Sequence, residues 1–530
     1  MSLYNNIFRN FSGFVLLSII FFVFIRFFAI YSIQSDRQLP IEPDDAFSYL
    51  TQINLAENDP VRESVLIRSL KEIIFVNAAN DNYKYSYDLS RLNNMIGENR
   101  YYGFTSSFIF LHNLGIDKLS LYWKLPYINQ ILHLLAALSL MSFFGLSRRQ
   151  KALSLFLYSF CFLFFFHQLK ASPFSLGLSL MIIPLALLKS SLIQKSIKKY
   201  ILVFILFCTV ILSVSFHQGV FLIALIISCA LFLYYLIAKD KIILNIFFIY
   251  LSAIVVYLII QSVLIMQFDY KIYSYLALNL NMLALNFDHN SITEVIQFNF
   301  FETYKKLISL FKFFSFNSLI LIPAIFYVVY TCLRKNLLVS ILFIFSLLLA
   351  IIGLIHYIPD HPGDLILYTG EFIFLICSMA YALMLDHFYD LLSSNKIVKL
   401  NFGIFFMMIF VYFIAVHLTA INNIIDKRLL RMNYKNHSTP IQNFLNEFAS
   451  NDISNCSLLI DDELTFIQTL ALSDLNIPIR PGNDMLGYKS WTIPDKFPKP
   501  CFYIGEDKTN ISSGRDIINV RYLKSLYIKY

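Results

Sequence analysis

Two adjacent carboxylates, Asp44 and Asp45, lie just beyond the first long apolar segment of the chain, in the stretch PDDAFSYL (residues 43–50). Carboxylates at the edge of a membrane are costly unless water, a cation or a substrate needs them. One of them can act as general base on an acceptor hydroxyl or amine, and two together can bind a divalent cation such as Mg²⁺ or Mn²⁺. The structural alternative is that Asp44 caps a short helix starting near Ala46 while Asp45 faces water.

Further polar side chains gather in three short connections between later apolar segments, and one lies inside such a segment. Lys170 offers a fixed cation for a phosphate, and the histidines and Asp360 offer hydrogen bonds to phosphate or hydroxyl groups. The alternatives are that Lys170 snorkels at a helix end and that the histidines are partly wet loop residues. Glu371 is a candidate because ionisable residues inside membrane segments are costly. The candidate substrate-binding residues are His167, Lys170, His217, Gln218, His356, Asp360, His361 and Glu371.

The composition predicts the elements that must position these residues. Of 530 residues, 58% are hydrophobic and 14% are charged, which is far more apolar than an ordinary soluble domain. Apolar windows of about 20 residues predict a polytopic α-helical protein that spans a lipid bilayer. The net charge of +8 is explained by basic loops, and no basic aromatic module points to nucleic acid. The eleven predicted spans are 11–33, 126–147, 152–168, 173–190, 200–215, 219–238, 242–266, 316–333, 337–356, 364–386 and 401–422.

The connections between these spans alternate in basic charge, which predicts the orientation of the chain. By the positive-inside rule the basic connections are cytoplasmic, so the N-terminus is inside and the C-terminus is outside. The acidic pair and the polar connections then share the outer side. The basic set comprises Arg9, Arg148, Arg149, Lys151, Lys189, Lys195, Lys198, Lys199, Lys239, Lys241, Arg334, Lys335, Lys396 and Lys399.

Two extracytoplasmic regions are predicted to fold. The outer loop 35–125 contains a predicted interfacial helix after Asp59 and Pro60. After the membrane domain, residues 1–422, the tail 423–530 is rich in Asp, Asn, Pro and Gly, and its pattern predicts a small α/β domain. Cys456 and Cys501 each precede a predicted strand, so a disulfide is geometrically possible if those strands are neighbours.

The acidic stretch 43–50 after the first span resembles the GT-C superfamily of polytopic glycosyltransferases. The resemblance implies a polyprenyl-phosphate-linked sugar donor, an extracytoplasmic acceptor and a catalytic aspartate in the first outer loop. A match to members with Asp-Glu selects Asp44, and a match to members with Asn-Asp selects Asp45. Many metal-using members carry a second acidic motif in the next outer loop. Here that loop, residues 166–173, has no carboxylate, so no metal ligand is assigned and a bound divalent cation is one option only.

Two other functions share these features. One is an O-antigen-type polymerase of surface polysaccharide, which also has about a dozen spans, but the acidic pair and the folded tail argue against it. The other is a flippase or transporter of lipid-linked sugar, which favours broken helices and ionisable groups at mid-membrane. The sequence is rich in Phe, Ile, Lys and Asn, which is typical of an AT-rich genome. This favours a bacterial inner membrane, with the site on its outer face.

Overall fold

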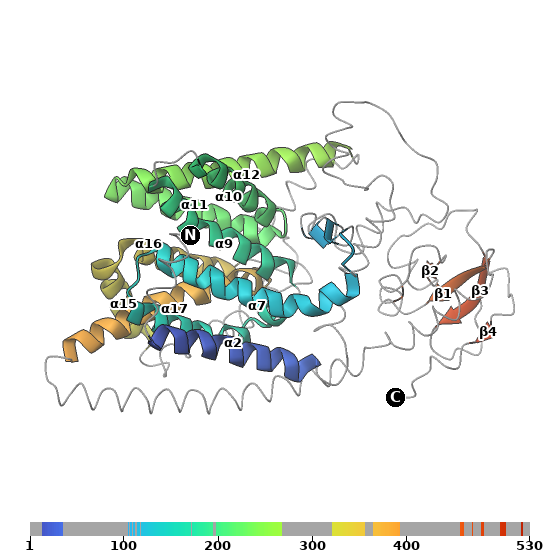
Figure 1. Cartoon of the computed structure of the whole chain (residues 1–530), viewed down its shortest axis with the longest axis horizontal. Helices are drawn as coiled ribbons and strands as arrows, with labels where there is room; N and C mark the ends of the chain where they lie inside the picture. The colour runs from blue at the N-terminus through green and yellow to red at the C-terminus, as the bar shows by residue number, and fades with distance from the viewer. Residues whose placement is uncertain are drawn as a thin grey trace. The chain divides into compact units, whose positions relative to one another are not determined.

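A computed structural model of the chain describes residues 13–34, 104, 107–108, 110–111, 114–116, 118–170, 172–193, 198–267, 321–355, 364–392, 456–460, 469, 479–481, 499–504 and 521–522. These residues are mostly helical (Figure 1). Contacts divide the chain into two compact units, residues 1–36 with 124–426 and residues 37–123 with 427–530. The helices are α2 (Gly13–Gln34), α7 (Lys118–Phe143), α8 (Arg148–Tyr158), α9 (Pro173–Ile193), α10 (Lys198–Val214), α11 (Gln218–Ala238), α12 (Lys241–Gln267), α15 (Leu321–Lys335), α16 (Leu337–Ile355) and α17 (Asp364–Leu392). Two 3₁₀ turns, η2 (Cys161–Leu163) and η3 (Phe166–Leu169), lie between α8 and α9.

Six of the described helices, α2, α7, α9, α11, α12 and α17, are long and apolar enough to cross a membrane. Two further apolar helices, Lys199–Val214 and Leu337–Ala350, are shorter. The outer faces carry large apolar side chains: Phe14 and Phe24 of α2 are 76% and 67% exposed. Apolar faces of this size are unfavourable in water and match the hydrocarbon core of a bilayer. The expectation of a membrane protein is therefore supported, although the predicted number of eleven spans is not established.

Helix α17 (orange in Figure 1) is in contact with α8, α15 and α16. Every residue from 369 to 383 is buried. Its sequence there, TGEFIFLICSMAYAL, is apolar on almost all sides, as expected of a helix surrounded by other helices. Around it, α2 packs on α8, α9 on α10, and α11 on α12. Glu371 is the exception to the apolar surface of this stretch, and the helix holds it in the interior.

The third predicted span, 152–168, is wrong as a continuous helix. Helix α8 has 11 residues and ends at Tyr158, after which the chain forms η2 and η3. A helix of that length covers about 16 Å, against about 30 Å for the hydrocarbon core. The sequence 152–168 has no Gly or Pro to signal a break. At the break, the backbone carbonyls of Tyr158 and Ser159 accept hydrogen bonds from Arg26 of α2.

Four short strands lie in the C-terminal part of the chain: β1 (Cys456–Ile460), β2 (Ile479–Pro481), β3 (Lys499–Ile504) and β4 (Arg521–Tyr522). They form a parallel sheet in the order β2-β1-β3-β4, which requires crossover connections. Strands β1 and β3, which carry Cys456 and Cys501, are neighbours, with a register shift between Ser457 and Leu458. The α/β domain over 423–530 and the disulfide stay predictions, since the described residues in this part are the strands and Thr469.

Several other predicted features lie outside the described residues. They are the interfacial helix after Pro60, the span 401–422 and the connection 356–363.

Candidate functional site

The best-defined polar site in the described part of the chain is a buried cluster formed by α2, α7, the 159–172 segment, α9 and α17. Its organising group is Arg26, whose side chain is fully buried in the helical unit. The Arg26 Nη2 atom donates to the Tyr158 carbonyl at 2.6 Å and Nε donates to the Ser159 carbonyl at 3.3 Å. Nη1 donates to Gln130 Oε1 at 3.0 Å. The guanidinium therefore satisfies carbonyls that the end of α8 leaves free, at the negative end of the helix dipole.

Aromatic rings complete the surroundings of Arg26. The guanidinium carbon lies 4.1 Å from the ring centre of Phe22, 4.9 Å from that of Tyr158 and 5.9 Å from that of Phe162. Ring faces attract a cation, and the attraction is stronger where water is excluded. Among the described residues the hydrogen bonds of Arg26 all go to neutral oxygens, so carbonyl dipoles and rings rather than a bonded carboxylate stabilise its charge there.

Helix α7 supplies the amides that bind the far end of the 159–172 segment. Asn129 Nδ2 donates to the carbonyls of Gln168 and Lys170, at 3.2 and 3.3 Å. Gln130 Nε2 donates to the Gln168 carbonyl and, at 3.3 Å, to the Pro126 carbonyl. Both amide side chains are buried. Irregular backbone in a membrane interior must be satisfied by protein groups, and these two residues do that for the turn before α9.

A second set of contacts connects the segment to α9 through a histidine. Gln168 Nε2 donates to the Tyr158 hydroxyl at 2.9 Å, and that hydroxyl lies 3.5 Å from His133 Nδ1. The same ring nitrogen lies 3.1 Å from Ser179 Oγ on α9. His133 is buried, and both hydroxyls lie at its Nδ1 atom.

Glu371 brings a buried carboxylate into this cluster. Ser175 Oγ of α9 donates to Glu371 Oε1 at 2.6 Å. The charges of Arg26 and Lys170 both act on the carboxylate, and Lys170 is only 3% exposed. Beside it, Gly370 leaves room for the Phe165 ring, because a Cβ built at Gly370 would lie 2.0 Å from Phe165 Cε1. The glycine thus permits the close approach of the 159–172 segment to α17.

Four buried polar atoms in this cluster lack a hydrogen-bond partner among the described residues: Asn129 Oδ1, His133 Nε2, Gln168 Oε1 and Glu371 Oε2. Buried polar atoms are normally paired, so these four atoms are the places in the cluster where a further hydrogen-bond partner would fit. Three of the four are oxygen acceptors, which suit a partner that donates hydrogen bonds.

The predicted site residues are only partly brought together. Lys170 and Glu371 are both buried in the helical unit, and the charge of Lys170 acts on the Glu371 carboxylate. His217 instead caps α11, accepting from the Gly219 N–H at 2.9 Å, and packs edge-on against Phe174. His167 lies in η3 and Gln218 begins α11, but their side chains are not described. Asp44, Asp45, His356, Asp360 and His361 lie outside the described residues.

The site residues that sequence reasoning missed are Arg26, Asn129, Gln130 and His133. Arg26 carried a usable signal, because it is the single charged residue in the apolar run of α2. Asn129, Gln130 and His133 stand among the apolar residues of α7 with spacings of one and three, which places them on neighbouring turns.

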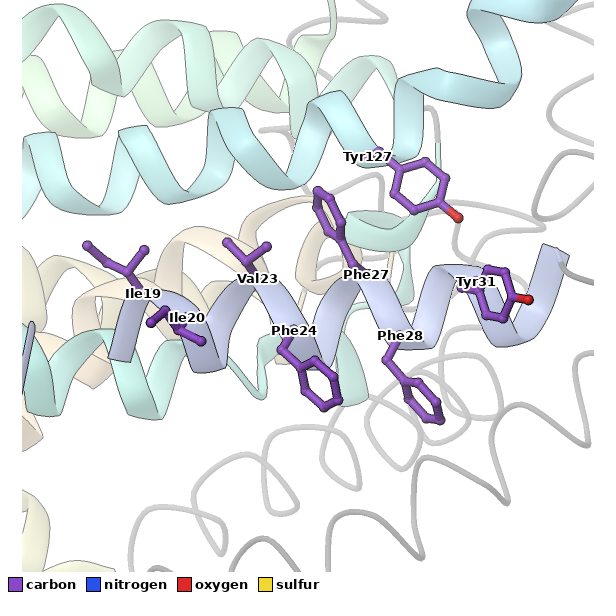
Figure 2. A pocket seen from close by; sticks show the side chains of 8 residues that line it. All are labelled: Ile19, Ile20, Val23, Phe24, Phe27, Phe28, Tyr31 and Tyr127. Atoms are coloured by element: carbon purple, nitrogen blue, oxygen red, sulfur yellow. The ribbon is translucent and has the colours of Figure 1, made fainter. Parts of the chain in front are cut away.

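An apolar groove lies on the outer surface of α2 (Figure 2). Its volume is about 650 Å³. The rings of Phe27 and Tyr127 meet edge to face there, with centres 5.2 Å apart. The two hydroxyl groups, from Tyr31 and Tyr127, lie toward the same end of the groove (Figure 2). The lining residues are Ile19, Ile20, Val23, Phe24, Phe27, Phe28, Tyr31 and Tyr127.

Within the described residues no group of three His, Cys, Asp or Glu side chains converges on one point as a metal site would require. No protein-family model matches the chain, and no curated protein matches its sequence. The function is therefore argued from the site.

Proposed function

We propose that the chain is a membrane glycosyltransferase that transfers a sugar from a polyprenyl-phosphate-linked donor to an extracytoplasmic glycan, lipid or protein acceptor. The observation that carries the proposal is the buried cluster of Lys170, Arg26 and Glu371 within a bundle of membrane-length helices. The charges of Lys170 and Arg26 both act on the Glu371 carboxylate. Lysine and arginine are also the residue types that bind phosphate oxygens through charge-assisted hydrogen bonds, which supports an anionic donor.

The roles follow from the types of residue. Lys170 neutralises the donor phosphate as its bond to the sugar breaks, since charge develops on that oxygen. Asp44 or Asp45 takes the proton of the acceptor hydroxyl or amine as that group attacks the sugar. The apolar groove on α2 supports a lipid-linked donor, because it offers hydrocarbon contact beside a pair of tyrosine hydroxyls. A bacterial inner membrane, with the site on the outer face, is part of the same proposal.

A transfer assay in lipid nanodiscs tests this function. The purified chain is given a radiolabelled polyprenyl-phosphate sugar and a panel of acceptors. We expect Asp44→Asn or Asp45→Asn to abolish transfer and Lys170→Gln to raise the KM for the donor about ten-fold or more, the effect of losing one charge-assisted contact. Lys199→Gln is the control, because Lys199 lies at the start of α10 over the Tyr200 ring. Full transfer by both aspartate variants would contradict the base mechanism.

A second candidate function is a flippase for a lipid-linked sugar, and one observation favours it. Helix α8 is broken next to a buried arginine and a buried glutamate, a combination that transporters use at their substrate sites. The two functions separate in sealed vesicles with labelled donor in one leaflet. A flippase would move the lipid across without forming a glycosidic product. A transferase would form product without equilibrating the leaflets.

A further inference from the structure

The 159–172 segment depends on side chains from other helices for its carbonyl partners. Its own backbone bonds are those of short turns, such as Leu163 N to the Phe160 carbonyl at 3.0 Å and Gln168 N to the Phe165 carbonyl at 3.2 Å. Arg26 of α2 binds the carbonyls where the segment begins, at Tyr158 and Ser159. Asn129 of α7 binds the carbonyls of Gln168 and Lys170, where the segment ends. The segment is therefore held at both ends by groups distant in sequence.

Two of the residues that act on Glu371, Gln168 and Lys170, belong to the end of the segment that Asn129 holds. Lys170 is one of the two residues whose carbonyls accept hydrogen bonds from Asn129, and its charge acts on Glu371. The apolar sequence 152–168 by itself predicts a continuous helix. Because each residue of an α-helix turns the chain by about 100°, such a helix would point the Lys170 side chain in another direction. The position of Lys170 therefore depends on the helix ending at Tyr158. Arg26 is the residue that donates hydrogen bonds to the carbonyls at this end.

We propose that Arg26, together with Asn129, is a positioning residue that keeps the 159–172 segment out of helical register and so holds Lys170 beside Glu371. The role is a positioning one because Nε, Nη1 and Nη2 of Arg26 each donate to a protein oxygen. The consequence for catalysis rests on the proposed transferase function. The consequence for the backbone does not, so the two are tested separately.

Hydrogen exchange of the full chain in nanodiscs tests the backbone. In Arg26→Gln, which cannot reach two carbonyls and Gln130 at once, we expect amide exchange across 159–172 to rise about ten-fold or more, as for the loss of a charged hydrogen bond. In Arg26→Lys, whose ammonium lacks the planar fork, we expect a smaller rise. Exchange in α12 should stay unchanged. Exchange across 159–172 at the wild-type rate in Arg26→Gln would overturn the proposal.

A second variant covers the case in which Arg26→Gln fails to fold. Asn129→Leu keeps a side chain of similar size and removes both donations to the segment. Faster exchange confined to residues 168–172 supports the positioning role, and an unchanged rate there overturns it. The matched control is Arg334→Gln, since Arg334 lies on α15 and bonds Tyr330 at the protein surface.

A double-mutant cycle tests the consequence for transfer. If Arg26 acts only by placing Lys170, the variant Arg26→Lys with Lys170→Gln loses no more kcat/KM than Lys170→Gln alone, within about two-fold. Multiplied losses would mean that Arg26 acts independently and would overturn its positioning role. A wild-type chain that transfers no sugar would refute the proposed function, while the exchange measurements would still decide the positioning of the segment.

Discussion

Two arginines in the helical unit are stabilised in opposite ways. Arg26 is fully buried, and its hydrogen bonds go to two backbone carbonyls and an amide oxygen. Arg149, whose side chain is 42% exposed, pairs with the carboxylates of Asp386 and Asp390 and stacks 4.3 Å above the Tyr389 ring. Gln150 adds a hydrogen bond to Asp386 at 2.7 Å. The Arg149 cluster ties the start of α8 to the end of α17, whereas the Arg26 cluster ties the end of α8 to α2.

The difference separates a structural ion pair from a candidate site. At Arg149 each charge is paired with an opposite charge in the fold, so the ion pairs form without a ligand. At Arg26 the hydrogen bonds go to neutral oxygens, and the buried Glu371 Oε2 accepts no hydrogen bond from the described residues. A buried carboxylate oxygen without a partner is costly, and a fold keeps such a group where function requires it.

Replacing the two arginines should give the largest difference between the two clusters. Arg26→Met should lower the free energy of unfolding by about 3–5 kcal/mol, because three acceptors lose their donor in the interior. Arg149→Met should cost about 1–2 kcal/mol, because water and Gln150 replace part of the lost contact. Unfolding by titration of the purified protein with SDS measures both. An equal cost for the two variants would contradict the distinction between the clusters.

The close approach beside Glu371 gives the next largest effect. Gly370→Ala should cost about 1–3 kcal/mol, because the new methyl group would overlap the Phe165 ring. Gly13→Ala is the control, since nothing lies within 4 Å of a Cβ at that position. The same SDS titration measures both variants. Adding Phe165→Leu should recover part of the loss, and strict additivity of the two changes would show that they do not share the contact.

The Arg149 cluster can be divided between its two carboxylates. Asp386 is 4% exposed, and Asp386→Asn should cost about 1–2 kcal/mol through the loss of a charged partner in a confined place. Asp390 has a side chain that is 44% exposed, so Asp390→Asn should cost about 0.2–1 kcal/mol. Unfolding titrations at 0.05 and 0.5 M NaCl, chosen to span the range of screening, distinguish them. A strong salt dependence of the Asp386 effect would place that carboxylate in water.

The smallest effect is expected at the rim of the same cluster. Lys335 Nζ lies 3.5 Å from Asp390 Oδ2, and both side chains are substantially exposed. Lys335→Gln should change the free energy of unfolding by less than about 0.5 kcal/mol, since exposed ion pairs contribute little. The measurement is the unfolding titration used for Asp390, and a loss above about 1 kcal/mol would show that the pair is shielded from solvent.

Much of the helical framework could be predicted from the sequence. The positions of α2, α9, α11, α12 and α17 follow the apolar windows, because hydrophobicity over about 20 residues is a local property. Lys170 and Glu371 were also recognisable as candidates, since a charge in or beside an apolar run stands out. Their meeting in one cluster could not be predicted, because they lie on different elements and no local pattern relates them.

The sequence by itself determined an apolar, helical chain whose ionisable residues are few and conspicuous, because each of them is costly in a hydrocarbon environment. Only the tertiary structure decided that α8 stops at Tyr158. Arg26, which lies 133 residues before Ser159 in the chain, donates to the carbonyls at this end, and in our proposal these bonds oppose helix continuation in a stretch that has no Gly or Pro. Where a helix ends is set by which donors reach its last carbonyls, and in this protein those donors arrive from another helix.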